Sequence, residues 1–280
     1  MKDLRSHLRP VKFWQQVTAT LKQIDELFLA AKWIDTPTGG TFDLPLADDI
    51  SNVAATVVET TGPVLDGTNP AFSQLQFGVA PLWSTGRIKI SLQLWQDSPV
   101  LQDYLAAACT RRFQRGIGAQ FVSTLTSGIG TYTSSSSTAL VPDDLLNLIG
   151  QVDEEYARRG AWLMRYSTWV AIRKLTMSNH YFVSNNAQVD SNMRPYLLER
   201  PVYFCPGLDA IGAGKPPMVF GDLQRFVVRS VGAEQVLNKY TEVFMPNHQI
   251  GYEGVWRVEG KLLTASGTDA PLIALRQPLS

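Results

Sequence analysis

Residues that could carry out acid–base or nucleophilic chemistry are few and scattered in this 280-residue chain. The three histidines, His7, His180 and His248, lie far apart, and none is four residues from another histidine or beside a pair of carboxylates. A general base or a metal site needs several such groups in one place. Cys109 lies among alanines, where a small packed side chain is expected rather than a nucleophile. The sequence therefore predicts no catalytic residue, no cofactor and no metal site.

Two short motifs match known binding sites only in part. The run from Gly212 to Pro216 resembles a phosphate-binding loop, but Asp209 stands where the first glycine belongs, and Pro216 replaces the serine or threonine that would hold magnesium. Asp153-Glu154-Glu155 is an acidic run, but adjacent side chains on a helix point in different directions and cannot share one ion. We expect a surface turn and a solvent-exposed helix face.

The only dense basic cluster comprises Arg111, Arg112 and Arg115. Arginine binds phosphate well, but the cluster lacks the interleaved aromatic side chains on which nucleic-acid bases stack. An acidic protein surface is therefore the predicted partner. The seven tryptophans and twelve phenylalanines are spread along the whole chain, which is typical of core and interface anchors rather than of one ligand pocket.

The composition favours a protein that associates with copies of itself. Charged residues make up only 18% of the chain, hydrophobic residues 45%, and 25 basic residues balance 25 acidic ones. A surface with few charges and no net charge does not repel other copies of the protein. It also lacks the excess of positive charge expected of a free nucleic-acid-binding protein. Two cysteines are too few for a disulfide framework, and neither a membrane span nor a signal peptide is present, so we expect a cytoplasmic origin and no membrane partner.

The elements that must position these residues follow from apolar spacing. An amphipathic helix is predicted over 11–32, a strand over 87–92, and a long helix from the cap at Ser98 to about residue 125, weakened at Gly116 and Gly118. A polar flexible loop over 128–138 then leads to a mixed second half. Its predicted helices cover 142–159 and 168–177, and its strands 161–166, 201–205, 219–220, 226–231, 242–245 and 256–263. Because strands and helices do not alternate regularly, the fold class is α+β rather than a doubly wound sheet.

The stretch from Trp33 to Gly86 contains no lysine or arginine and six acidic residues. Residues 55–60 and 74–80 are predicted to form the two arms of an extended hairpin that turns at Asp66-Gly67. A projecting hairpin is marginal in water unless something covers it, and a neighbouring subunit is the expected cover. The charges predict an inter-subunit contact in which Glu59 and Asp66 of the hairpin face the basic cluster on the long helix of the next subunit, which carries Arg111, Arg112 and Arg115.

Several short segments occur in the order known from one protein family. They are Gly39-Gly40 with Leu44-Pro45; Ile90-Ser91, Leu94, Asp97 and Ser98; Trp162-Leu163-Met164 with Ser167 and Leu175; Leu198, Pro201 and Val202; Val219-Phe220-Gly221-Asp222; and Arg257 with Glu259-Gly260-Lys261. On these segments, from about residue 39 to 275, the sequence resembles the major capsid proteins of tailed bacteriophages, which have the Hong Kong 97-type fold. It departs from the family pattern at Glu199, where a glycine is common.

The resemblance implies an architecture with four parts. They are an N-terminal helical arm (1–38), an extended hairpin loop with its base strands (39–90), a spine helix and peripheral lobe (91–138), and an axial lobe whose strands return to the peripheral lobe (139–280). It also implies a non-enzymatic structural protein that assembles as pentamers and hexamers into an icosahedral shell around a genome. Its expected partners are copies of itself, a separate scaffold protein, portal and decoration proteins, and packaged DNA held by weak non-specific contact. Its expected location is the virion capsid, after assembly in the host cytoplasm.

Two alternatives stay open at the level of the sequence. An encapsulin, the shell protein of a bacterial nanocompartment, has the same fold and a similar length. A small-molecule-binding or hydrolytic enzyme with an aromatic pocket belongs to another class and would form only a small oligomer.

Overall fold

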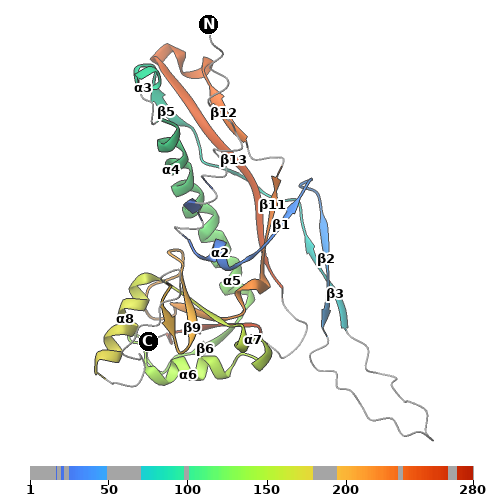
Figure 1. The fold of residues 1–280 in the computed structure, drawn as a ribbon, viewed down its shortest axis with the longest axis vertical. Helices are drawn as coiled ribbons and strands as arrows, with labels where there is room; N and C mark the ends of the chain where they lie inside the picture. The colour runs from blue at the N-terminus through green and yellow to red at the C-terminus, as the bar shows by residue number, and fades with distance from the viewer. Residues whose placement is uncertain are drawn as a thin grey trace, which may run out of the picture.

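The computed structural model describes residues 25–48, 71–97, 101–178, 194–232, 236–263 and 270–279, together with Val17, Thr20 and Leu21. In these residues it shows a long helix packed on one sheet, a second sheet covered by shorter helices, and a projecting two-stranded hairpin (Figure 1). No helix of the described residues is long and apolar enough to cross a membrane.

The long helix is built from α4 (Leu101–Phe113), a π-helical turn η2 (Gln114–Gly118) and α5 (Ala119–Gly128), with the short helix α3 (Leu92–Asp97) before it. Its buried stripe includes Leu105, Cys109, Ile117, Phe121 and Leu125, so the predicted helix and its apolar face are confirmed from residue 101 onward. The predicted cap at Ser98 lies outside the described residues. The two glycines expected to weaken the helix lie within the π-turn, where the chain makes one wider turn without ending the helix.

The first sheet packs against this helix (Figure 1). Its strand order is β1 (Lys32–Thr36), β11 (Phe226–Val231), β13 (Gln249–Leu262) and β12 (Val236–Tyr240), and β4 (Leu82–Ser84) and β5 (Ile88–Ser91) also pair with β13. Side chains alternate along β13. Trp256, Val258 and Leu262 belong to the main core beside the helix, whereas Arg257, Glu259 and Lys261 lie on the opposite face.

The second sheet has its own core. Its order is β6 (Gly130–Thr133), β14 (Leu272–Arg276), β10 (Met218–Gly221), β7 (Ala161–Met164), β9 (Arg200–Phe204) and β8 (Tyr196–Leu197). The helices α6 (Pro142–Gly150), α7 (Glu154–Arg158) and α8 (Tyr166–Ser178) pack around it (Figure 1). Trp162 and Phe220 are fully buried at its centre, with ring centroids 4.6 Å apart. A 3-10 turn, η3 (Leu223–Arg225), leads from this sheet into β11 of the first.

The predicted N-terminal helix ends close to its expected boundary but is interrupted before it. Val17, Thr20 and Leu21 are helical, Asp25 and Glu26 are not, and the chain is helical again in α2 (Leu27–Ala30) before it becomes extended from Lys32 as β1, parallel to β11. Glu26 accounts for the break, because its backbone N–H donates to the carbonyl of Phe204 and its carboxylate accepts from the N–H of Phe204. Trp33 of β1 then stacks on Trp256 of β13, with the ring centroids 6.1 Å apart.

The hairpin prediction is wrong in its pairing. The strands are β2 (Phe42–Asp48) and β3 (Ala71–Phe77), so residues 74–77 pair with 42–45 rather than with an arm at 55–60. The predicted first arm and the predicted turn at Asp66-Gly67 lie outside the described residues. The strand β2 was not predicted because it contains Pro45, and proline argues against a central strand. A proline is tolerated in a two-stranded ribbon because both strands are edge strands.

Two further predictions in the second half are corrected. Residues 242–245 form part of η5, a 3-10 turn over Glu242–Asn247 that ends at His248 in the left-handed region (φ 51°), and are not a strand. The stretch 128–138 includes the strand β6, and the serines after it are anchored. The carboxylate of the buried Asp144 accepts hydrogen bonds from the Ser134 hydroxyl (2.5 Å) and the Ser135 N–H (3.3 Å).

Candidate subunit interface

One face of the hairpin β2–β3 carries a row of apolar side chains, and the other face is mixed. Directly opposed residues share a face, so the pairs Phe42–Phe77 and Leu44–Leu75 lie together, and Leu46 continues the same row. Close to the body, Phe77 is fully buried in a small cluster with Val227 and Leu263, whereas the leucines farther along the ribbon are only partly buried. A two-stranded ribbon has no second layer of its own. The apolar row therefore continues beyond what the subunit itself covers.

Large apolar side chains are exposed around the same hairpin. Phe72 on the other face of β3 is 79% exposed, and Val79 and Leu82, on the chain that leaves the hairpin, are 70% and 65% exposed. Exposed apolar side chains on and beside one projecting element are typical of a protein-binding surface. This hairpin is the strongest candidate for contact with another chain.

A buried arginine holds the base of the hairpin. Arg229 of β11 is only 1% exposed. Its Nε donates to the hydroxyl of Thr36 (3.0 Å), its Nη1 to the carbonyl of Gly78 (3.0 Å), and its Nη2 to the carbonyls of Thr38 (2.9 Å) and Gly40 (2.6 Å). The acceptors therefore lie both on the segment that enters the hairpin (the entering chain) and on the segment that leaves it (the leaving chain).

Two more cations from β13 contact the same hairpin. Arg257 donates from Nε to the carbonyl of Ala80 and from Nη2 to that of Gly39, both at 3.1 Å. Lys261 donates to the carbonyl of Gln76 at 2.5 Å and lies 3.7 Å from the carboxylate of Glu259. We call Arg229, Arg257 and Lys261 the basic clamp.

The basic cluster predicted as an inter-subunit contact lies on the long helix. Arg111 and Arg115 are exposed, whereas Arg112 donates to the carbonyl of Thr85 (2.7 Å) within the same subunit. Glu59 and Asp66, their predicted partners, lie outside the described residues. The contact between hairpin acids and helix arginines therefore stays a prediction, with Arg112 already used inside the subunit.

The N-terminal segment meets the long helix at a buried carboxyl group. Asp25 is completely buried, and its Oδ1 accepts from the N–H of Leu27 (3.1 Å). Burial raises the pKa of this carboxyl from 3.8 to about 6, against the lowering effect of that hydrogen bond and of the Cys205 thiol. Burial also raises the pKa of Cys205 well above its ordinary value, and the nearby Asp25 charge adds to the effect, so the thiol is held in its unreactive form.

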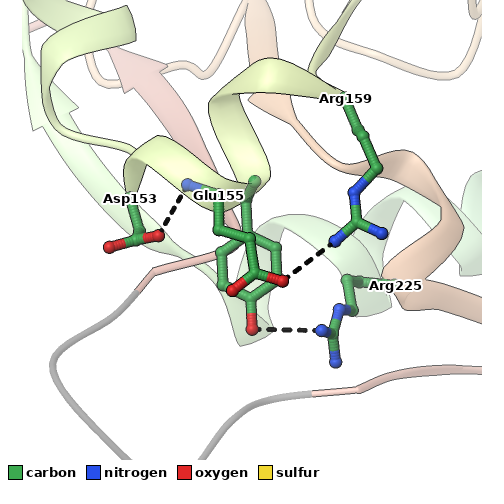
Figure 2. A network of polar contacts seen from close by, with 5 residues as sticks. Asp153, Glu155, Arg159 and Arg225 are labelled. Carbon is green, nitrogen blue, oxygen red and sulfur yellow. Dashed lines mark hydrogen bonds and ion pairs between the residues drawn. The ribbon is translucent and has the colours of Figure 1, made fainter. Parts of the chain in front are cut away.

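The acidic run Asp153-Glu154-Glu155 serves its own helix. Asp153 caps α7 by accepting from the N–H of Glu155 (2.9 Å), and Glu155 pairs with Arg159 at 3.4 Å (Figure 2). Arg225 donates to the hydroxyl of Tyr156 (3.1 Å), which ties α7 to the turn between the two sheets. The predicted solvent-exposed helix face is confirmed for Glu154 and Glu155.

The loop that resembles a phosphate site is filled by the chain itself. The N–H of Gly212 donates to the side chain of Gln277, and the N–H of Gly214 to its backbone carbonyl. Lys215 lies 3.6 Å from Asp209. Among the residues that the structure describes, no group of three histidine, cysteine or acidic side chains could hold a metal ion.

The comparison with protein-family models identifies the family of this chain. The model of the phage capsid family matches residues 7–267. The chain belongs to the phage capsid family. It is therefore a structural capsid protein rather than an enzyme, and the enzyme alternative is set aside.

Solved structures of phage-type capsids share the fold of this capsid protein. The capsid of an empty GTA particle, computed with C5 symmetry, superposes with a TM-score of 0.67 at 17% identity, over 93% of this chain and 90% of that one. A structure titled Microbacterium phage Oxtober96 superposes with a TM-score of 0.59 at 13% identity, over 90% of this chain and 91% of that one. A structure titled Mycobacterium phage Bobi superposes with a TM-score of 0.57 at 15% identity, over 91% of each chain. No curated protein matches the sequence. The α+β capsid fold expected from the resemblance is confirmed.

Sequence reasoning missed the basic clamp of the capsid protein. Arg257, Glu259 and Lys261 were noticed only as part of a family-like segment, and Arg229 not at all. Their alternation along a predicted strand was the available signal, because every second residue of a strand lies on the same face. What they contact could not be read from it, since Arg229 and Gly40 are 189 residues apart.

Proposed function

We propose that this chain is the major capsid protein of a tailed double-stranded DNA phage or a phage-like particle, and that it forms the pentamers and hexamers of an icosahedral shell. The observation that carries the proposal is the hairpin β2–β3, whose apolar row extends beyond its own subunit. Each hairpin docks on a neighbouring subunit, and burial of the apolar row against that neighbour supplies the main attraction.

The proposed parts of the chain follow from this role. Residues 1–38 serve as the N-terminal arm, 39–90 as the extended loop, 91–138 as the spine helix with the peripheral lobe, and 139–280 as the axial lobe with strands that return to the peripheral lobe. The separate core of the second sheet supports an axial unit. The interlocked strands of the first sheet, which come from residues 32–36, 82–91 and 226–262, support a peripheral unit. A scaffold protein, portal and decoration proteins and packaged DNA complete the proposed assembly in the host cytoplasm.

Two pairs of substitutions on opposite faces of the hairpin test the docking. We expect Leu44→Ser with Leu75→Ser, an opposed pair on the apolar face, to abolish closed particles while the subunit stays folded. The matched control is Asp43→Ser with Gln76→Ser, the adjacent opposed pair of polar residues on the mixed face, which should assemble like the wild type. Negative-stain microscopy measures the particles, and circular dichroism measures the fold. Equal assembly of both variants would show that the apolar row is not an interface.

The contents of purified particles separate a phage capsid from an encapsulin. We expect particles from infected or induced cells to contain nuclease-protected double-stranded DNA. An enzyme bound to the inner wall, with no nucleic acid, would support the nanocompartment alternative instead.

A further inference from the structure

Arg229 of the basic clamp joins the two segments at the base of the hairpin through its guanidinium group. Arg229 reaches Thr36, Thr38 and Gly40 on the entering chain and Gly78 on the leaving chain. Guanidinium is planar and carries five N–H donors in a fixed arrangement, so the positions of its acceptors are fixed relative to one another. The hairpin cannot turn about its base without breaking several of these hydrogen bonds.

Arg257 repeats the arrangement one strand away. Its guanidinium contacts Gly39 on the entering chain and Ala80 on the leaving chain. The entering chain passes so close that a Cβ atom on residue 39 would lie 2.2 Å from the guanidinium carbon. Only glycine allows this approach, so the contact between Arg257 and the entering chain depends on Gly39.

The clamp is built on the longest described strand of the first sheet. Arg257, Glu259 and Lys261 lie on one face of the 14-residue strand β13, and Arg229 stands directly opposite Glu259 in the register of β11 and β13. The other face of β13 is packed against the long helix through Trp256 and Val258. The clamp therefore transmits the orientation of the core to the hairpin, and Glu259 supplies a negative charge among its cations.

We propose that Arg229 and Arg257 are positioning residues for assembly, which fix the direction in which the hairpin leaves the subunit and hence where it meets its neighbour. The part about the neighbour rests on the proposed function, whereas the part about the hairpin direction concerns the single subunit. A cation alone is insufficient for this role, because the three donors of a lysine ammonium share one atom on a flexible stem and do not hold acceptors on two segments in a fixed planar arrangement.

Conservative variants test the clamp within the subunit. Arg229→Lys and Arg257→Lys keep the charge and remove the fork, and Arg276→Lys, at an exposed arginine on β14, is the matched control. Amide hydrogen exchange is compared with wild type in the same oligomeric state. We expect residues 42–48 and 71–77 to exchange at least tenfold faster in the two clamp variants, with 161–164 and 218–221 unchanged. Wild-type exchange in the hairpin of both clamp variants would overturn the proposal.

A variant of Gly39 covers the case in which a clamp arginine is needed for folding. Gly39→Ala changes neither arginine, but its Cβ atom displaces the Arg257 guanidinium. This variant should therefore accelerate amide exchange in the hairpin in the same way. Unchanged exchange in a folded Gly39→Ala variant would contradict the clamp as described.

Particle geometry tests the second half of the proposal. By negative-stain microscopy we expect Arg229→Lys to reduce the fraction of closed particles of wild-type diameter several-fold, with aberrant or open shells in their place. Normal particles from a variant whose hairpin exchanges faster would refute the role in assembly. If wild-type protein forms no particles, the proposed function fails, and the exchange measurement still decides whether the clamp orients the hairpin.

Discussion

The carboxyl group of Asp25 lies against Gly118, so closely that a Cβ atom on residue 118 would come within 2.9 Å of Asp25 Oδ2. This contact joins the N-terminal segment to the π-turn of the long helix. Within the described part of the chain, that oxygen makes no regular hydrogen bond, although the residue is fully buried and the Cys205 thiol interacts with the carboxyl group. A buried carboxylate oxygen without a strong partner is unfavourable, and the neutral form of the acid relieves this penalty.

The Asp25 carboxyl makes stability depend on pH in a defined direction. Because its pKa is raised to about 6 in the folded protein, the folded state binds the proton more tightly, and this contribution to stability is lost as the pH rises from about 4 through 6. Asp25→Asn keeps the shape and removes the charge. We expect it to raise the free energy of unfolding at pH 7.5 by about 1 to 3 kcal/mol.

The measurement is denaturant unfolding of wild type and Asp25→Asn between pH 5 and 8. The groups identified around Asp25 are the Cys205 thiol, the Glu26 carboxylate and the Leu27 N–H. The difference between the two proteins should grow with pH up to about 7 and then stay constant. A variant that is less stable than wild type at every pH would contradict the raised pKa.

Two glycines of the π-turn should respond differently to alanine. At Gly116 a Cβ would lie 3.5 Å from the Trp83 ring, an ordinary contact, whereas at Gly118 it would press on the buried Asp25. Alanine favours a helix by up to about 1 kcal/mol over glycine. We expect Gly116→Ala to be neutral or stabilising and Gly118→Ala to be less stable than it by at least about 1 kcal/mol. Thermal unfolding of the two variants gives this ranking, and the reverse order would show that the π-turn can move away from Asp25.

The exposed arginines of the long helix should guide assembly rather than stabilise the subunit. We expect Arg111→Glu with Arg115→Glu to slow assembly at low salt, with partial recovery when Glu59 and Asp66 are also changed to lysine. Exposed pairs contribute up to about 1 kcal/mol each and are screened beyond about 8 Å at physiological salt, so the effect should fade as salt increases. Light scattering of empty-shell assembly follows the rate. No recovery by the second pair of changes would exclude the contact, and normal empty shells with poor DNA filling would indicate that the arginines face DNA.

The buried Asp144 should be needed to hold the serine-rich loop. Asp144→Ala removes the acceptor of Ser134 and Ser135 and should lower the free energy of unfolding by about 1 to 3 kcal/mol. Asp143→Ala, at the exposed neighbouring position, is the control and should change it by less than about 0.5 kcal/mol. Chemical denaturation measures both. Equal effects would mean that the loop has other anchors of similar strength.

Local patterns in the sequence predicted the elements whose side chains face one continuous core. The apolar stripe of the long helix, the strands at 88–91, 161–164 and 226–231, and the α+β class all follow from spacing within one element. The acidic run was interpreted correctly for the same reason, because its partners are two to four residues away on the same helix. These features depend on near neighbours in the chain, which the sequence contains directly.

Only the tertiary structure decided which segments pair and what the clamp residues hold. The strand β1 was not predicted because its stacking partner Trp256 is more than 200 residues away, and β2 was missed because its partner β3 begins only after 22 further residues of the chain. Arg229 looks like an ordinary strand residue until β1, β11 and both ends of the hairpin come together around it. A sequence by itself determines how each segment can bury its apolar side chains, but strand pairing and the partners of a buried cation are set by the competition among distant segments for the same space.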